Sequence, residues 1–541
     1  MAADNSKAFT VQNNVYKGKV SSVVVNYNSL AELIWSKMKS NGDKIAHLDA
    51  CTEKVVTYTK LQDKVVKCAL WLQKQEIKPG DVVTVCTHNH FDSIVPCLAA
   101  IYVNAIFNPW YEGMDLQTAL HVMQLTTPKV IFCSEKPANI ILRAIKESNF
   151  NPIVVVFGDH PDAITFSNIL NNHSNAEVTN FRYVEIDNIK QTACIIHSSG
   201  TTGMPKGVEM SNYCLIIASV DTNVNLNNAV SIWFSSLYWF SGIIMNLKSI
   251  VQGATVILYP EFDEEMTCKL IEKYKVTVIF LSPSMINRFL KAGYAKKYSL
   301  SSLAVVICTG AIIKPKVQEE IRCILPYAQM LQGFAMTELG GLATLQFPHH
   351  KAGSCGTVIE NVEIKIVDPE NGKILDPNNQ GELWIKTAII MNGYYRNPEA
   401  TKRTVDEEGW LHSGDIGYFD EDGELYIVDR IKELIKYRGF QISPGQVEGV
   451  LITHPAVMEV AVLAVPHPID DEHPIAFVTK VPDAKVTEQE LIDFVANNMM
   501  DQYKLRAGVI FLDAFPYTGS GKIARKELKT MIRKLTVESN N

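Results

Sequence analysis

Short apolar strands alternate with helices from about residue 60 to residue 308, and this alternation limits the possible fold more than any other feature. Residues 60–75 carry apolar side chains at helical spacing, and residues 82–86 form a β-branched run after a Pro-Gly turn. A helix over 92–104 continues the pattern, with strands at 105–108, 130–133, 153–157, 256–259, 276–281 and 303–308. Because a helix between two strands places them parallel in one sheet, the sequence predicts an α/β region of stacked sheets.

The pattern changes twice in the C-terminal part. From about Thr357, strands alternate with Pro, Asn and Gly turns, which predicts an antiparallel sheet or a β-barrel-like part at 362–367, 382–386 and 424–428. A second unit follows, with expected helices at 444–453 and 487–499, strands at 458–465, 475–480 and 508–512, and a final helix. We therefore expect a large N-terminal domain (1–428), a hinge (429–432) and a small α+β domain (433–541).

Composition bounds the class of protein. The 541 residues are 47% hydrophobic and 20% charged, as in globular enzymes. The net charge of −7 argues against a nucleic-acid surface, which would need a concentrated basic face, so no nucleic-acid partner is expected. The eleven cysteines include no C-x-x-C pair, which favours reduced thiols inside a cell. Neither an apolar signal segment nor a C-terminal Ser-Lys-Leu address is present, so we expect a cytoplasmic protein, with a peroxisomal location as the alternative.

Residues 231–259 form the longest apolar stretch, which is long enough to invite a transmembrane interpretation. Asn246, Lys248, Gln252 and Gly253 interrupt it. The favoured prediction is a buried helix followed by a strand, with no integral membrane segment.

Residues 196–207, Ile-His-Ser-Ser-Gly-Thr-Thr-Gly-Met-Pro-Lys-Gly, follow an apolar run and combine glycines, hydroxyls and a lysine. Gly200 and Gly203 permit turns whose successive amides form a nest for an anion. Lys206 adds a positive charge, and hydroxyl donors come from Ser198, Ser199, Thr201 and Thr202. Pro205 rules out a Walker loop, and an ordinary Ser/Gly-rich surface loop is the alternative. We predict a loop that grips the phosphates of a nucleotide.

Two later turns carry groups suited to the rest of a nucleotide. The turn 332–338 combines a phenylalanine, which can stack on a purine, with Glu338, whose carboxylate suits Mg²⁺; a helix cap is the alternative. The turn 409–415 ends in Asp415, which can accept hydrogen bonds from ribose hydroxyls; a Trp-anchored surface turn is the alternative. Arg430 can add contacts to the ribose or the α-phosphate.

A Gly-rich loop at 515–522 ends in Lys522 and precedes a basic helix. A lysine on such a loop can reach the large domain and neutralise charge that develops on an acyl phosphate. The basic residues of the helix are better explained as a solvated face than as a ligand site.

In order and spacing, these segments resemble the adenylate-forming superfamily, which includes acyl-CoA synthetases, plant 4-coumarate–CoA ligases, peptide-synthetase adenylation domains and beetle luciferases. The matching blocks lie between about Leu61 and Leu528 and comprise Ser198–Gly207, Gln332–Glu338, Gly381–Leu383, Gly393–Tyr394, Gly409–Asp415, Asp429–Arg430 and Ser520–Lys522. The segments 410–416 and 435–441 most resemble the insect branch of acyl-CoA synthetases and luciferases.

The resemblance implies a two-step reaction. A carboxylate attacks the α-phosphate of ATP to give an acyl-adenylate and pyrophosphate; the small domain then rotates at Asp429 and Lys432, and the thiol of coenzyme A releases AMP. Lys522 would bridge the carboxylate and the α-phosphate, and Thr202 and Glu338 would hold Mg²⁺. The implied catalytic residues are Lys522, Lys206, Thr202 and Glu338, and the remaining implied nucleotide contacts are Ser198, Ser199, Gly200, Thr201, Gly203, Gly310, Ala311, Gly333, Phe334, Thr337, Asp415, Arg430 and Arg438.

The chain departs from the family pattern at several positions. Trp239, followed by Phe240, stands where many relatives have the His of the acyl pocket, whose wall would include Thr309. A Trp would shorten or reshape that pocket. Ala218 and Arg438 stand where beetle luciferases have Arg and Lys, which counts against beetle-type luciferin chemistry.

The leading hypothesis is an ATP-dependent acyl-CoA synthetase acting on a medium-chain, long-chain or aromatic carboxylic acid, with a role in fatty acid metabolism. ATP, Mg²⁺ and coenzyme A are the expected cofactors, a small-molecule carboxylic acid is the expected partner, and a monomer or weak dimer is expected. The alternatives are a luciferase-type monooxygenase, which oxidises an adenylated luciferin with O₂, and a catalytically silent binding paralogue.

Overall fold

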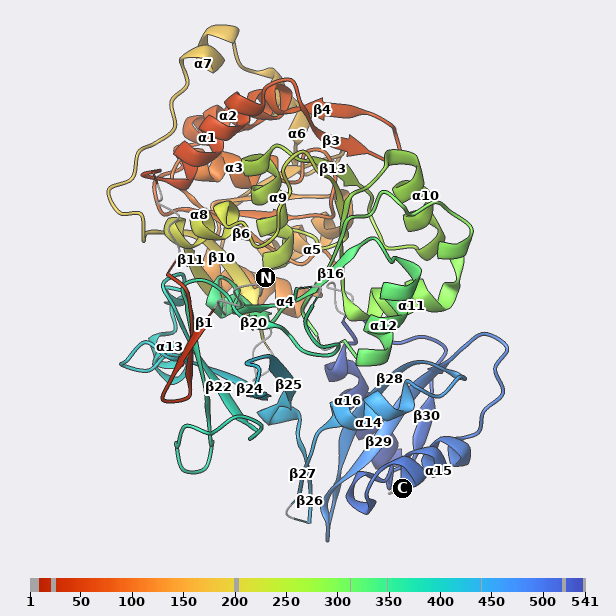
Figure 1. Cartoon of the computed structure of the whole chain (residues 1–541). Helices are drawn as coiled ribbons and strands as arrows, with labels where there is room; N and C mark the ends of the chain where they lie inside the picture. Colours follow the sequence, from red (N-terminus) through yellow and green to blue (C-terminus); the bar gives the residue numbers. More distant parts are fainter. Residues whose placement is uncertain are drawn as a thin grey trace, which may run out of the picture.

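The computed structural model describes residues 9–20, 26–198, 204–311, 313–347, 349–438, 440–517 and 522–538. Figure 1 shows three regions: a large α/β body, an antiparallel sheet beside it, and a smaller α+β unit drawn in blue. The body contains two mostly parallel sheets, as the alternation of strands and helices predicts.

The first sheet of the body has eight strands, in the order β23-β11-β10-β6-β5-β7-β8-β9. They are β5 (Val82–Cys86), β6 (Ile106–Pro109), β7 (Val130–Cys133), β8 (Ile153–Val156), β9 (Ile164–Thr165), β10 (Thr192–Ser198), β11 (Lys206–Ser211) and β23 (Gly393–Tyr394). Neighbours from β10 to β9 pair in parallel, whereas β11 and β23 add an antiparallel edge. All of β5 is buried, as expected for a β-branched strand covered on both faces.

The second sheet has seven strands, in the order β16-β15-β14-β12-β13-β3-β4. They are β3 (Ile45–Asp49), β4 (Val55–Thr57), β12 (Val230–Trp233), β13 (Thr255–Leu258), β14 (Val278–Leu281), β15 (Val305–Cys308) and β16 (Gln329–Gln332). Pairing is parallel from β16 to β3, and β4 closes the edge in the antiparallel direction.

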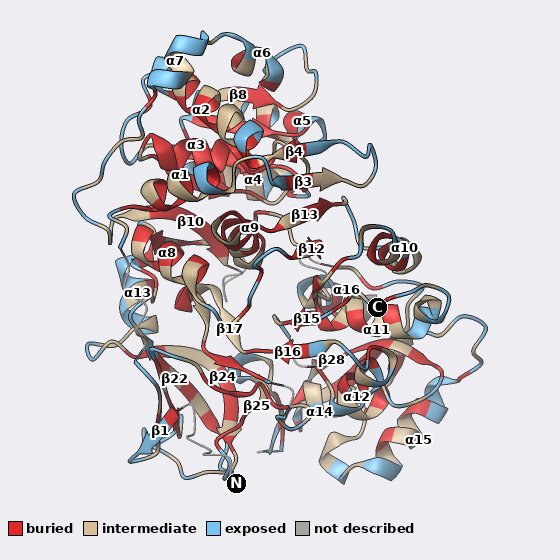
Figure 2. Ribbon diagram, turned by 45° about the horizontal axis from the view of Figure 1, so that its top comes forward, coloured by how far each residue is buried: buried red, intermediate tan, exposed pale blue. Residues whose placement is uncertain are grey.

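Helices pack between the two sheets and on their outer faces. One core joins both sheets to α1 (Leu30–Asn41), α2 (Tyr58–Lys74), α3 (Val95–Tyr102), α8 (Asn212–Val220) and α9 (Phe240–Gln252). The first sheet is covered outside by α4 (Leu116–Thr126) and α5 (Glu135–Lys146), and the second by α10 (Glu264–Tyr274), α11 (Pro283–Ala292) and α12 (Pro315–Ile324). Short helices α6 (Phe166–Asn171) and α7 (Asn175–Asn180) pack beside α2. Figure 2 shows buried residues concentrated where α1, α3 and β10 meet.

The helix α2 illustrates how local sequence forms these elements. It begins after Thr57, whose hydroxyl accepts a hydrogen bond from the backbone N–H of Lys60. The apolar residues that recur at helical spacing are all buried: Leu61, Val65, Cys68 and Leu72.

The long apolar stretch forms the predicted buried helix, α9, and the predicted strand, β13, and these are preceded by β12, which was not predicted. Within the described residues, no helix combines the length and hydropathy needed to cross a bilayer. All eleven cysteines carry free thiols, as the absence of paired spacings predicts.

The antiparallel region is a six-stranded sheet in the order β1-β2-β21-β22-β24-β25. Its strands are β1 (Phe9–Gln12), β2 (Val15–Gly18), β21 (Val362–Val367), β22 (Gly381–Thr387), β24 (Leu411–Phe419) and β25 (Leu425–Arg430), with α13 (Pro398–Thr404) between β23 and β24. The sequence was compatible with either an antiparallel sheet or a barrel-like part. The described strands form a sheet with β1 and β25 at its edges. The N-terminal hairpin, for which the sequence predicted no strand, pairs with β21.

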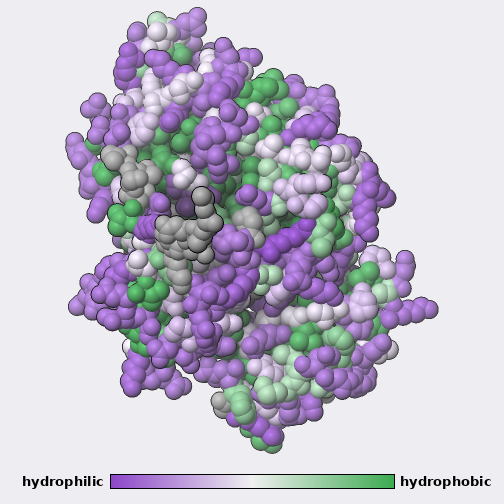
Figure 3. All heavy atoms as spheres, viewed as in Figure 1, coloured by the Kyte–Doolittle hydropathy of each residue, from purple (hydrophilic) through white to green (hydrophobic). Residues whose placement is uncertain are grey.

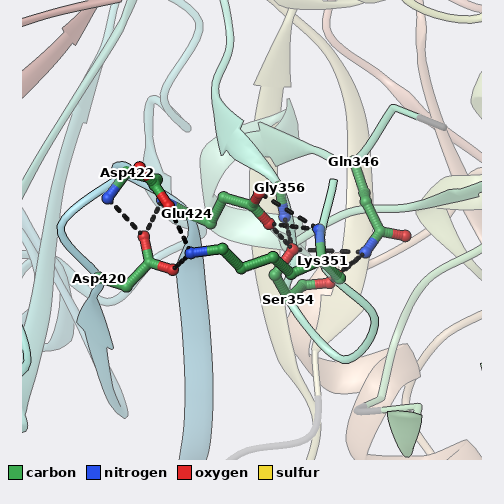
Figure 4. Close-up of polar contacts among 7 residues, drawn as sticks. All are labelled: Gln346, Lys351, Ser354, Gly356, Asp420, Asp422 and Glu424. Carbon is green, nitrogen blue, oxygen red and sulfur yellow. Dashed lines mark hydrogen bonds and ion pairs between the residues drawn. The ribbon is translucent and has the colours of Figure 1, made fainter. Parts of the chain in front are cut away.

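A polar network attaches the end of the body to this sheet (Figure 4). The Lys351 ammonium lies 2.6 Å from a carboxylate oxygen of both Asp420 and Asp422. The Ser354 hydroxyl donates to Glu424 at 2.5 Å, and the Gln346 amide donates to the Lys351 carbonyl at 2.6 Å. Residues 351–354 are therefore held against the turn that joins β24 to β25.

The small unit contains β26 (Ile435–Tyr437), β27 (Phe440–Ile442), β28 (Val457–His467), β29 (Asp471–Lys480) and β30 (Val509–Phe511). The helices α14 (Pro444–Leu451), α15 (Glu488–Asn498) and α16 (Arg525–Glu538) accompany this sheet. The sequence predicts β28, β29, β30 and the three helices in this order, with ends that differ by a few residues, whereas it did not predict β26 and β27.

Candidate active site

The segments predicted to bind a nucleotide follow the carboxyl ends of neighbouring parallel strands. Residues 309–311 follow β15 and Gly333 follows β16, and the last residues of these strands, Cys308 and Gln332, pair directly. Trp239 comes after β12 in the same sheet. Because ligands of open α/β sheets bind at the carboxyl edge, the topology brings these segments to one place suited to a ligand.

The predicted phosphate loop joins the end of β10 to the start of β11. Ser198 and Lys206 pair directly across this hairpin, so both ends of the loop are fixed. Gly207 packs tightly, because a Cβ there would lie 2.8 Å from a methyl of Ile195. The five candidate residues between these ends lie outside the described residues: Ser199, Gly200, Thr201, Thr202 and Gly203.

Tyr394 joins two of the predicted catalytic residues. The Lys206 ammonium lies over the Tyr394 ring, 4.7 Å from its centroid. The Tyr394 hydroxyl donates to Glu338 Oε1 at 3.0 Å, and burial followed by the Glu338 charge raises the pKa of Tyr394. Tyr394 belongs to one of the blocks that match the family, but the resemblance implied no functional role for it. Its position depends on the pairing of β23 with β11, which links segments far apart in sequence.

The turn after β16 has little space for larger residues. A Cβ on Gly333 would lie 2.7 Å from the Thr344 carbonyl oxygen. Phe334 is half-buried, and its N–H donates to the Thr344 hydroxyl at 3.3 Å. Thr337 opens the short 3-10 helix that carries Glu338, whose side chain is buried. The predicted adenine and metal contacts thus lie on one tightly packed turn.

Asp415 and Arg430 form an ion pair between β24 and β25. The two residues are direct partners in the antiparallel register, and Arg430 Nε donates to Asp415 Oδ1 at 3.1 Å. Burial raises the pKa of Asp415, while the charges of Arg430, Lys432 and Lys522 oppose this. The structure therefore brings Asp415 and Arg430 together, as expected of two ribose contacts.

Lys522 reaches from the small unit to the large body. A Cβ built on Gly310 would lie 3.2 Å from Lys522 Cε and 3.4 Å from its Nζ, and Gly310 has a φ of +93°. A side chain at Gly310 would be strained and would crowd the lysine. Burial, followed by the charge of Arg430, lowers the pKa of Lys522 to about 8, and the Asp415 carboxylate opposes this shift. Lys522 is thus placed beside Gly310 and the Asp415–Arg430 pair.

The predicted hinge residues, Asp429 and Lys432, interact with polar and charged groups on either side of the hinge. Asp429 Oδ2 accepts hydrogen bonds from the Ser443 hydroxyl at 2.7 Å and the Gly445 N–H at 3.0 Å, at the first turn of α14. A carboxylate there also complements the helix dipole. Burial, followed by the charge of Arg430, lowers the pKa of Lys432.

Arg438, which the resemblance implies to be a nucleotide contact, is engaged within the small unit. Its Nε donates to Asp470 Oδ1 at 2.6 Å. This arrangement groups Lys522, and not Arg438, with the predicted ribose contacts.

Two of the predicted acyl-pocket residues, Trp239 and Phe240, lie at the start of α9, whereas Thr309 follows β15. Trp239 immediately precedes the helix, Phe240 is its first residue, and the Trp239 ring meets Tyr238 edge-on at 4.8 Å. A small pocket beside them is lined mainly by aromatic and apolar side chains: Trp110, Tyr111, Met114, Thr118, Val122, His197, Pro205 and Tyr238. Burial lowers the pKa of His197 to about 3, so its ring is neutral at physiological pH. This lining was not predicted, because its members come from four separate segments.

Known protein families match most of the chain. Residues 34–395 match the model of the AMP-binding enzyme family, and residues 446–522 match that of the AMP-binding enzyme C-terminal domain. The chain is 31% identical to 4-coumarate–CoA ligase 4 of Arabidopsis thaliana, over 96% of this chain and 94% of that protein.

Luciferase relatives are almost as similar. The chain is 30% identical to luciferin 4-monooxygenase of Nipponoluciola cruciata, over 91% of this chain and 92% of that protein. The solved structure of the luciferase-like enzyme from the nonluminescent mealworm Zophobas morio is 29% identical, with a TM-score of 0.73, and covers 78% of this chain and 100% of that one. The chain therefore belongs to the AMP-binding enzyme family, the adenylate-forming enzymes that its motifs resemble and that include AMP-forming acid–thiol ligases.

Proposed function

We propose that this protein is an ATP-dependent acyl-CoA synthetase that converts a carboxylic acid, ATP and coenzyme A into an acyl-CoA thioester, AMP and pyrophosphate. The observation that carries the proposal is the position of Lys522, beside Gly310 and the Asp415–Arg430 pair. A lysine on the small unit needs this reach if it is to act on a substrate bound by the large body.

Each of the described site residues has a separate role in the first step, the formation of the acyl-adenylate. Asp415 accepts the ribose hydroxyls, and Arg430 holds its carboxylate in position. Lys522 neutralises the charge that develops between the substrate carboxylate and the α-phosphate, which is the usual dominant effect in such catalysis. With a pKa of about 8, its ammonium is mostly protonated at neutral pH.

Lys206 and Glu338 flank Tyr394 on the phosphate side of the site. Lys206 offsets phosphate charge. The buried Glu338 carboxylate is a hard oxygen ligand that fits Mg²⁺, and Thr202 would supply the second ligand. When bound, Mg²⁺ would neutralise pyrophosphate oxygens, while Tyr394 holds Glu338 toward them.

We propose domain boundaries at 1–428, 429–432 and 433–541, with rotation about Asp429 and Lys432 between the two steps. Lys522 would leave the site and coenzyme A would enter. A cytoplasmic monomer or weak dimer fits this cycle. The identities to 4-coumarate–CoA ligases support the thioester product.

The residues proposed to bound the acyl site are Trp239, Phe240 and Thr309. The bulk of Trp239 favours an aromatic or shortened acyl group. Replacing Trp239 with Gly should therefore shift preference toward longer fatty acids. Tyr327→Gly, at an exposed aromatic residue outside the proposed acyl site, serves as the control, and an unchanged chain-length profile in Trp239→Gly would contradict this assignment.

A direct assay tests the function. Purified protein is incubated with ATP, Mg²⁺ and a panel of medium-chain, long-chain and aromatic acids, with and without coenzyme A, while AMP and light are recorded together. AMP release in the dark that depends on coenzyme A supports the synthetase. No AMP release with any acid would favour a silent binding paralogue.

A luciferase-type monooxygenase is the second candidate, favoured by the 30% identity to a luciferin 4-monooxygenase. Light that requires ATP and O₂ but not coenzyme A would support it. Because both candidates form an adenylate first, loss of AMP formation in a Lys522 variant does not distinguish them, whereas the coenzyme A dependence does.

A further inference from the structure

The small unit carries a group of side chains that the proposed reaction does not use. His467, Asp470 and His473 surround the tip of the β28–β29 hairpin, and their ligand atoms all lie within 4.8 Å of one another. Two imidazoles and a carboxylate form a donor set that proteins use to bind transition metals.

The hairpin register explains why these residues meet. His467, the last residue of β28, pairs with Asp471, and Val465 pairs with His473. Residues 465, 467, 471 and 473 therefore share one face, which makes the two histidines diagonal neighbours. Asp471 has a φ of +66°, so the chain turns tightly and carries Asp470 back over that face.

The geometry orients all three side chains inward. The two imidazole rings stack with centroids 3.9 Å apart. His473 Nε2 lies 2.8 Å and His467 Nδ1 lies 3.6 Å from Asp470 Oδ2. Asp470 is buried, with 6% of its surface exposed, although solvent reaches the histidines.

Arg438 completes the arrangement from outside. Its Nε donates to Asp470 Oδ1, the oxygen that faces away from the histidines. Outer partners of this kind orient metal ligands in known sites. Because the Arg438 side chain is 62% exposed, water and salt screen its repulsion of a bound cation.

We propose that His467, Asp470 and His473 form a binding site for a divalent transition-metal ion, with Zn²⁺ as the best match. Nitrogen donors favour Zn²⁺ over Mg²⁺ and Ca²⁺, which prefer oxygen ligands. The three protein ligands leave a fourth tetrahedral position for water. His467 Nδ1 accepts the backbone N–H groups of Ile469 and Asp470 at 3.4 and 3.2 Å, so this nitrogen carries a lone pair, and these hydrogen bonds must be released when it binds the ion.

Binding requires a small local change. The ion replaces the proton between His473 and Asp470, and the neutral imidazole then carries its proton on Nδ1. Ligand atoms about 2.0 Å from a tetrahedral ion are about 3.3 Å apart, so the 2.8 Å contact opens slightly. The ion then ties both strands of the hairpin to the Asp470 carboxylate.

Metal titration of the full-length protein tests the site. A Cys51→Ser/Cys323→Ser background removes the two exposed thiols, which can bind the same ions. Chelator-treated protein is titrated with Co²⁺ by absorbance and with Zn²⁺ by calorimetry. We expect one ion per chain, a tetrahedral Co²⁺ spectrum, and a higher Tm with Zn²⁺ but not with Mg²⁺.

Variants locate the ion. His467→Ala, His473→Ala and Asp470→Asn should each weaken Zn²⁺ binding at least tenfold and remove the Tm increase. His454→Ala is the control, because this histidine lies in the same unit but packs against Phe494. Absence of binding, or equal binding in His473→Ala and the parent, would overturn the proposal. Its failure would leave the proposed ligase function untouched, because no step of this test measures turnover.

Discussion

The interior of the large body and its contact with the small unit are built from different interactions. The body core consists of apolar side chains from both sheets and the helices between them, such as Leu61 and Phe107, which are almost fully buried. Contacts to the small unit are polar: Lys314 donates to the Gly445 carbonyl, and Lys291 donates to the Met458 carbonyl at 3.0 Å. The face shown in Figure 3 is likewise mostly hydrophilic.

This difference separates permanent packing from contact that can be exchanged. A fully buried Leu or Phe contributes about 1.5–3 kcal/mol through burial, and water cannot replace that contribution. A hydrogen bond across a hydrated contact contributes about 1 kcal/mol, since water bonds to the same groups after separation. The small unit is therefore suited to leave the site while the body stays folded, as the proposed two-step reaction requires.

Among the groups at the contact between the body and the small unit, Lys522 should have the largest effect on the reaction rate when it is removed. Lys522→Ala should reduce adenylate formation by roughly 10²–10³-fold, the typical cost of a lost transition-state donor. Thioester formation from preformed acyl-AMP should be largely spared, which separate assays of the two steps can measure. Lys485→Ala, an exposed lysine of the same unit, is the control. Equal loss in both steps would contradict the assigned role.

The pH dependence sharpens the same assignment. Because the Lys522 pKa is lowered to about 8, the required ammonium is lost as pH rises through that value. Adenylate formation should fall by up to about tenfold per pH unit above it. The rate of pyrophosphate release during adenylate formation, measured from pH 6.5 to 10, gives this pH dependence. The residual activity of Lys522→Arg should lack this fall, and an identical fall there would assign it to another group.

Tyr394 tests the part of the site that lies within the body. Tyr394→Phe keeps the ring below Lys206 but removes the hydrogen bond to Glu338. A hydrogen bond to a charged group contributes about 1.5–3 kcal/mol, so kcat/KM for ATP should fall roughly 10- to 150-fold. Tyr395→Phe is the matched control. Unchanged kinetics at limiting Mg²⁺ would show that Glu338 does not depend on Tyr394.

Replacement of Lys314 should have the smallest effect on the adenylation rate. This effect should come from the contact between the body and the small unit alone. Burial lowers the pKa of Lys314, and its ammonium is bonded to the Gly445 carbonyl in the first turn of α14. Lys314→Met should slow adenylation less than about tenfold, because one exchangeable hydrogen bond is lost. Lys316→Met on the same helix is the control. A large loss of Tm in Lys314→Met would place this lysine in permanent packing and weaken the comparison.

The sequence predicted most elements because they depend on local patterns. The strands at 82–86, 130–133 and 362–367 have the predicted bounds, since β-branched runs between turns leave little choice of register. The N-terminal strand β2 was missed because its partner in the sheet, β21, lies more than 340 residues away along the chain, and β1 pairs with β2. No local pattern marks such a pairing.

In the candidate site, too, local sequence identified individual residues but not their arrangement in space. Glycine-rich turns and charged residues identified Lys206, Glu338, Asp415, Arg430 and Lys522 one segment at a time, because special turns require special residues. Their arrangement was not local. Tyr394 joins Lys206 to Glu338 only through the pairing of β23 with β11, and the metal-ligand group appears only once the β28–β29 hairpin sets its register.

The sequence by itself determined the type and order of the elements and the chemistry available in each turn, since periodicity and turn composition act over a few residues. Tertiary structure alone decided which turns meet: the carboxyl edge of the second sheet, the ion pair of Asp415 with Arg430, and Lys522 beside Gly310. Those contacts join residues separated by tens to hundreds of positions. They form because burial of the apolar cores fixes the sheets, and the sheets then place the polar groups.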